Sequence, residues 1–234
     1  MARFRSVLFD CDSTLSSIEG IDELAREHKA EIERLTEMAM RGEVALEAVY
    51  GRRLAIIRPS RAELERVGAL YVDRLVAGAR ETVGALREAG VEVRIISGGL
   101  RPAVLHVARA LGIDETLVFA VAISFDERGE YAGFDEASPL ARQGGKSALI
   151  ASWTDLPRPA MLVGDGATDL EAKGAVDRFV AFAGVEAREA VVAGGDDVVR
   201  APSLLPVLAL ALGDDVPRES GIRQLVRQGL ELLT

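Results

Sequence analysis

Short apolar runs that end in glycine or a carboxylate recur along the chain and predict the buried strands of a parallel sheet. The first run covers residues 5–9 and stops at Asp10, and later runs cover residues 91–96, 160–164 and 178–182. Stretches with apolar residues at helical spacing separate these runs. This alternation is typical of α/β proteins, and it predicts a doubly wound parallel sheet of the Rossmann-like kind.

Helices are predicted at residues 81–89 and 102–111 and from about residue 168, with glycine or proline marking their ends. Residues 118–125 and 130–134 alternate around the turn sequence DERG. This pattern predicts a β-hairpin beside the main sheet.

The stretch between the first two strands has a different pattern, in which apolar residues recur at helical spacing without a strand signal. Ser60 followed by Glu63 is a capping-box signature for the start of one helix. The expected division is a helical cap insertion at residues 17–75, an α/β core at residues 1–16 and 76–213, and a helical C-terminal tail at residues 214–234.

The composition is that of a globular protein, with 49% hydrophobic and 28% charged residues among 234. It excludes a mainly disordered chain. The 28 basic and 37 acidic residues give a net charge of −9. This charge argues against nucleic acid as a partner, because phosphate backbones need basic faces. A small phosphorylated substrate is still compatible with this net charge, since a pocket can be locally positive on an acidic protein.

The single cysteine, Cys11, has no second cysteine with which to form a disulfide. The fold must therefore be stable without one, which favours a reducing compartment and hence the cytoplasm. The apolar stretches are too short for a signal peptide or a membrane span, so we expect no membrane partner.

Two pairs of carboxylates follow predicted strands. Asp10 and Asp12 come directly after the first strand, and Asp165 and Asp169 follow the run that ends at Gly164. Carboxylates this close repel unless a cation or a proton separates them, and oxygen ligands suit a hard cation such as Mg²⁺. Taken singly, each pair also fits a solvated turn or a helix cap. Together they predict one crevice at the carboxyl edge of the sheet, with a metal in it.

Two further segments could bind phosphate. Ser97, Gly98 and Gly99 end a predicted strand, and a hydroxyl beside free backbone N–H groups can hold an anion. Lys146 opens a predicted helix after two glycines, and its ammonium could neutralise a phosphate. Taken in isolation, the first segment is better explained as a simple turn and Lys146 as a solvated surface lysine.

The motifs DCDST, SGG, GGK and GDGATD, in this order, resemble the four motifs of the haloacid dehalogenase superfamily of phosphohydrolases. Within that superfamily, the segments EGIDELA and RRLAIIRPS resemble the branch whose substrate is O-phospho-L-serine. The resemblance covers residues from about 5 to 200. It implies a Rossmann-like haloacid dehalogenase core with an inserted helical cap.

The resemblance also implies roles for individual residues. Asp10 would be the nucleophile that forms an aspartyl-phosphate, and Asp12 would protonate the leaving oxygen and then activate water. Mg²⁺ would be held by Asp10, by the backbone carbonyl of Asp12 and by Asp165, with Asp169 supporting the site. The substrate contacts that it implies are those of Glu19, Met40, Arg53, Ser97, Gly98, Gly99, Lys146 and Thr168.

Among these contacts, Glu19 would pair with the substrate ammonium and Arg53 with its carboxylate, while Met40 would line the cap side of the pocket. The implied reaction is the Mg²⁺-dependent hydrolysis of O-phospho-L-serine to L-serine and phosphate, the last step of L-serine biosynthesis. A related phosphatase, or a phosphotransferase that passes the phosphoryl group to an alcohol such as homoserine, is the nearest alternative. A non-catalytic sensor of phosphorylated ligands is a further one. A monomer and a homodimer are both compatible with the sequence.

Overall fold

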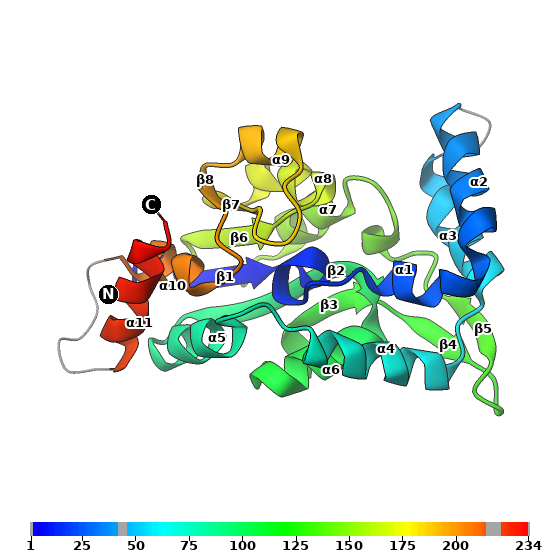
Figure 1. Ribbon diagram of the computed structural model, residues 1–234, viewed down its shortest axis with the longest axis horizontal. Helices are drawn as coiled ribbons and strands as arrows, with labels where there is room; N and C mark the ends of the chain where they lie inside the picture. The colour runs from blue at the N-terminus through cyan, green and yellow to red at the C-terminus, as the bar shows by residue number, and fades with distance from the viewer. Residues whose placement is uncertain (1, 42–45, 214–220, 234) are drawn as a thin grey trace.

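The computed structural model describes residues 2–41, 46–213 and 221–233. Its centre is a six-stranded parallel sheet in the order β3-β2-β1-β6-β7-β8 (Figure 1). The strands are β1 (Ser6–Phe9), β2 (Glu92–Leu100), β3 (Val118–Val121), β6 (Ala160–Gly164), β7 (Arg178–Phe182) and β8 (Asp197–Val199). The predicted doubly wound α/β fold is confirmed.

Helices cover both faces of the sheet, which is why β1 and β6 are apolar along almost their whole length and buried at every residue. One face carries α5 (Ala79–Glu88) and α6 (Arg101–Leu111), and the other carries α7 (Gly145–Ser152), α8 (Ala167–Glu171) and α9 (Glu189–Gly194) (Figure 1). Beyond α5 lie α10 (Leu205–Leu212) and α11 (Gly221–Glu231). None of the described helices is both long and apolar enough to cross a membrane.

The order of the strands determines where a ligand can enter. From β1 the chain builds outward through β2 to β3, then returns to the other side of β1 and builds outward through β6, β7 and β8. The register places Phe9 of β1 opposite both Ile95 of β2 and Val163 of β6. The connections after β1 and β6 therefore diverge, and a crevice opens at the carboxyl ends of these two strands.

Helices also fill the described part of the segment between β1 and α5. They are α1 (Gly20–Leu24), α2 (Lys29–Met40), α3 (Leu46–Ile57) and α4 (Arg61–Asp73). The two ends of this segment meet in an isolated antiparallel bridge between Ser16 and Leu75, and the Ser17 N–H donates to the Arg74 carbonyl over 2.9 Å. We call this paired entry and exit the neck. The predicted capping box is confirmed, since Ser60 and Glu63 bond each other's backbone N–H groups.

The structure corrects one strand prediction and adds one strand that was not predicted. Residues 118–125 do not form one strand of a hairpin: β3 ends at Val121 and joins the main sheet, while β4 (Ile123–Phe125) pairs with β5 (Tyr131–Phe134). Both pieces are extended and apolar, so the local pattern does not mark the break between them. The edge strand β8 was not predicted, because three residues are too few to show a period. Near the C-terminus α11 forms where the sequence predicts a helix and packs on α10.

The contact between α10 and α11 generates a stability prediction. A Cβ atom added at Gly229 would overlap the backbone carbonyl of Leu205, so Gly229→Ala should force the two helices apart. We expect a loss of about 1–3 kcal/mol in the free energy of unfolding, measured by urea denaturation. The control is Gly84→Ala on α5, where an added Cβ meets nothing within 4 Å and alanine should be neutral or stabilising. Equal stability of the two variants would contradict this close approach.

Candidate active site

The turn after β1 presents the first two carboxylates. The Asp10 N–H still bonds the Val163 carbonyl of β6 over 2.9 Å, so Asp10 sits at the end of the sheet. The chain then makes a tight turn, Cys11–Leu15, which the Ser16 N–H closes by donating to the Cys11 carbonyl over 3.0 Å, and in which Ser13 has a φ of 49°. Left-handed backbone is strained for a residue other than glycine, and such strain is often found at functional sites. Here the turn sends the Asp10 and Asp12 side chains to different neighbours.

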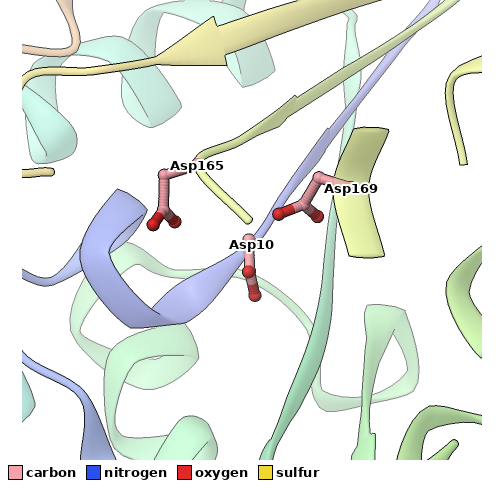
Figure 2. Close-up of side chains that lie close together, drawn as sticks. All are labelled: Asp10, Asp165 and Asp169. Atoms are coloured by element: carbon pink, nitrogen blue, oxygen red, sulfur yellow. The ribbon is translucent and has the colours of Figure 1, made fainter. Parts of the chain in front are cut away.

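Asp10 lies in a cluster with two other acids. One carboxylate oxygen from each of Asp10, Asp165 and Asp169 lies within 4.8 Å of the others, and all three residues are buried. Figure 2 shows the three carboxylates around a common space. The backbone of Gly164 makes this approach possible, because an added Cβ there would overlap the Asp169 carboxyl group.

Lys146 provides positive charge within the cluster. Its Nζ lies 2.7 Å from an Asp10 oxygen and 2.6 Å from an Asp169 oxygen. Burial alone would lower the pKa of Lys146, but the two carboxylates outweigh burial and raise it. The ammonium group is therefore charged at any physiological pH. Burial raises the pKa of Asp169, and the nearby lysine opposes that rise.

The cluster also suits a metal ion. Its donors are all carboxylate oxygens, and the Thr14 hydroxyl orients Asp165 by donating to Oδ1 over 2.9 Å. In the described part of the chain, the cations ion-paired to the three acids are Lys146 and Arg188. Three buried carboxylates thus outnumber two cations, a balance that a hard divalent cation with oxygen ligands would correct.

Asp12 is separate from this cluster. Its Oδ1 accepts from the Gly20 N–H over 2.7 Å and from the Tyr71 hydroxyl over 2.5 Å, and its Oδ2 accepts from Ser97 Oγ over 3.3 Å. Burial, followed by repulsion from Asp10 and Glu19, raises the pKa of Asp12 to about 7. A carboxyl group with this pKa can both hold and release a proton near neutral pH.

Residues 97–99 at the end of β2 lie where its register with β3 shifts, and this irregular loop contributes a polar wall. Ser97 is buried, and its Oγ accepts from the Gly99 N–H over 3.0 Å, which fixes the turn. The Gly98 carbonyl accepts a hydrogen bond from the Tyr50 hydroxyl on α3 over 2.9 Å. This loop is therefore connected both to Asp12 and to the helices of the segment 17–75.

One cavity of about 460 Å³ connects these groups. Asp10, Asp12, Lys146 and Asp165 line its floor. The further predicted residues along its walls are Glu19, Arg53, Gly98, Gly99 and Thr168. Two other predicted site residues, Ser97 and Asp169, lie behind the floor. Ser97 donates a hydrogen bond to Asp12, and Asp169 accepts one from Lys146. Met40 ends α2, and its side chain lies outside the described residues.

Among the lining residues that were not predicted from the sequence, three have polar side chains: Tyr50, Tyr71 and Arg188. Tyr71 shares helical spacing with buried apolar residues of α4, so its pattern indicates packing alone. Arg188 forms an ion pair with Asp165 and a longer one of 3.5 Å with Glu19. It precedes α9 without any motif around it, so the sequence carries no signal for it.

Comparison with known proteins places this geometry in a family. A model of the haloacid dehalogenase-like hydrolases matches residues 4–177. A phosphoserine phosphatase of Bos taurus is 44% identical over 190 residues, covering 80% of this chain and 84% of its own.

Two solved structures are similar over 88% of this chain and 98% of theirs. A substrate-bound phosphoserine phosphatase complex is 26% identical with a TM-score of 0.70, and a phospho-aspartyl intermediate analogue of phosphoserine phosphatase is 25% identical with a TM-score of 0.69. The fold, the converging carboxylates and the extent of the family match agree, and the chain belongs to the haloacid dehalogenase-like hydrolase family.

Proposed function

We propose that this chain is a phosphoserine phosphatase that hydrolyses O-phospho-L-serine to L-serine and phosphate. The observation that carries the proposal is a single cavity lined by two chemically distinct sets of residues. One set is Asp10, Asp165 and Lys146, and the other is Glu19 and Arg53. A phosphorylated amino acid needs both a phosphoryl site and contacts of opposite charge for its ammonium and carboxylate groups.

In this proposal Asp10 attacks phosphorus directly. A carboxylate needs no base to become a nucleophile, and Lys146 at 2.7 Å keeps positive charge where phosphoryl oxygens would crowd. The bond from phosphorus to the seryl oxygen breaks as the bond to Asp10 forms. Asp12 gives its proton to the leaving seryl oxygen, which its raised pKa permits.

The second step returns the enzyme to its starting state. Asp12, now ionised, takes a proton from a water molecule as the water oxygen attacks phosphorus. The bond between phosphorus and the Asp10 oxygen breaks, which releases phosphate and the free carboxylate. The hydrogen bonds from Gly20 and Tyr71 hold Asp12 in one orientation during both proton transfers.

The resident metal is proposed to be Mg²⁺, which suits an all-oxygen donor set. Asp10, Asp165 and Asp169 with the backbone carbonyl of Asp12 would hold it. When bound, it would add positive charge beside the transferring phosphoryl group. This assignment is supported by the excess of buried carboxylates over cations.

The substrate contacts are divided between these two sets of residues. Ser97, the backbone of Gly98 and Gly99, Lys146 and Thr168 are proposed to bind the phosphoryl oxygens. Arg53 would grip the carboxylate with two parallel hydrogen bonds, and Glu19 would pair with the ammonium. Glu19 already accepts a hydrogen bond from Ser13 over 2.7 Å, which holds it at the cavity wall. Met40 is proposed to complete the pocket on the cap side, residues 17–75.

The alternatives differ in what they need from these residues. A phosphotransferase of the same family would pass the group from Asp10 to an alcohol instead of water, so release of free phosphate separates the two. A non-catalytic sensor would not require a nucleophile beside a proton donor. The chain keeps both Asp10 and Asp12, which supports an enzyme. The buried free thiol of Cys11 supports a cytoplasmic location.

The first test concerns the nucleophile. Asp10→Asn should reduce phosphate release from phosphoserine at least about 10⁴-fold, because an amide does not attack phosphorus. Acid quench of the wild type during turnover should leave phosphate on Asp10. The control is Asp73→Asn, an exposed position at the end of α4, which should behave as the wild type. Substantial turnover by the Asp10 variant would refute covalent catalysis at this residue.

The second test concerns the metal. Exhaustive chelation should stop phosphate release, and Mg²⁺ should restore it far better than Ca²⁺, whose looser coordination misaligns the reacting atoms. Mg²⁺ should also raise the melting temperature of the wild type but not that of Asp165→Asn, since binding to the folded state alone stabilises it. A chelated enzyme with full activity, or an equal shift in both proteins, would exclude the proposed site.

The third test concerns the amino-acid end of the substrate. Arg53→Ala should lower kcat/KM for phosphoserine, with a loss of transition-state stabilisation of about 2–4 kcal/mol. The effect on 4-nitrophenyl phosphate should be much smaller, because the aryl ester has no carboxylate. Arg53→Lys should also be impaired, since an ammonium cannot make a two-pronged contact. Arg52→Ala, exposed on the same helix, is the matched control. Equal losses for both substrates would assign Arg53 to the fold or to the phosphoryl group.

A further inference from the structure

Tyr50 connects the helical segment to the irregular loop, residues 97–99, at the end of β2. Its side chain extends from α3 into the wall of the cavity, where its hydroxyl donates to the Gly98 carbonyl over 2.9 Å. Gly98 belongs to the loop assigned above to the phosphoryl group. The bond therefore joins a helix of the segment 17–75 directly to the loop that would hold the phosphate.

The ring of Tyr50 is held in place from the other side. It packs on Phe134 of β5 with ring centroids 5.6 Å apart and planes tilted by 58°. The next residue, Gly51, also packs on this ring, because an added Cβ would lie 3.3 Å from the Phe134 Cζ atom. Contacts with both β2 and β5 thus determine where this part of α3 can lie.

Arg53 lies three residues further along the same helix. Residues at this spacing share a helix face, and both side chains line the same cavity. Any shift of α3 that moves Tyr50 away from Gly98 therefore also moves Arg53 away from the phosphoryl loop.

We propose that Tyr50 is a positioning residue that sets the separation between the carboxylate-binding Arg53 and the phosphoryl-binding loop. The enzyme would thereby select substrates by the number of bonds between their phosphate and carboxylate groups. This inference rests on the phosphoserine assignment above. It adds a residue that determines specificity without touching the reacting atoms.

The chemistry of the hydroxyl suits a permanent contact. Burial, followed by repulsion from Asp12 and Tyr131, raises the pKa of Tyr50 well above its ordinary value. The phenol therefore stays protonated and donates its hydrogen bond throughout the pH range in which a phosphatase works.

The experiment compares Tyr50→Phe with the wild type on three substrates: phosphoserine, O-phosphohomoserine, which is one methylene longer, and 4-nitrophenyl phosphate. The variant keeps the ring against Phe134 and removes only the hydroxyl. We expect KM for phosphoserine to rise about three- to tenfold with a smaller change in kcat. The preference for phosphoserine over phosphohomoserine should fall by a similar factor, and the aryl phosphate should lose much less. Tyr131→Phe, on β5 and outside the cavity, is the matched control and should resemble the wild type.

The outcomes are distinguishable. A wild type that releases phosphate from the aryl ester but not from phosphoserine would overturn the proposed function, and this inference with it. If the wild type hydrolyses phosphoserine and Tyr50→Phe keeps its preference over phosphohomoserine, the positioning role is refuted. Equal losses on all three substrates would also refute it, because they would show that the hydroxyl supports the fold or the chemistry in general.

Discussion

The crowding of carboxylates at the ends of β1 and β6 is the constraint to which the rest of the site responds. Asp10, Asp165 and Asp169 are buried within 4.8 Å of one another, a position that repulsion and desolvation both oppose. Lys146 relieves part of this cost by touching two of them. The arrangement is stable only where rigid elements hold every participant. The central strands of a doubly wound sheet provide such elements, because their carboxyl ends are buried and fixed by pairing on both sides.

Two acids separated by one residue acquire different chemistry from their surroundings. Asp10 contacts an ammonium group, whereas Asp12 receives neutral donors, the Gly20 N–H and the Tyr71 hydroxyl, and no cation in the described part of the chain. Neutral donors compensate burial less than a full charge does, so the pKa of Asp12 rises to about 7. Both residues have extended backbone angles, and their side chains reach different partners. The immediate surroundings of each carboxyl group thus give neighbouring acids different properties.

Much of this organisation could be predicted from the sequence, since burial on both faces makes each central strand an uninterrupted apolar run. The break within residues 118–125 could not, because two consecutive apolar strands with different partners have the same local pattern. The acids and Lys146 follow strands or glycines, which marks them as candidates. Tyr50, Tyr71 and Arg188 carry no such mark. They reach the cavity through tertiary packing between segments distant in the sequence, and local periodicity does not encode such distances.

The neck between Ser16 and Leu75 has a consequence for the order of folding. About 85 residues separate Phe9 from its partner Ile95, and closing a loop of that length carries an entropic penalty that grows with the logarithm of its length. Once the neck has formed, the chain between these two residues is effectively only about 30 residues long, which lowers the penalty by about 1 kcal/mol. Formation of the inserted helices and their neck therefore lowers the entropic cost of pairing the two strands that position Asp10. For the pairing of β1 with β2, the inserted helices therefore act as a short connection once their neck has formed.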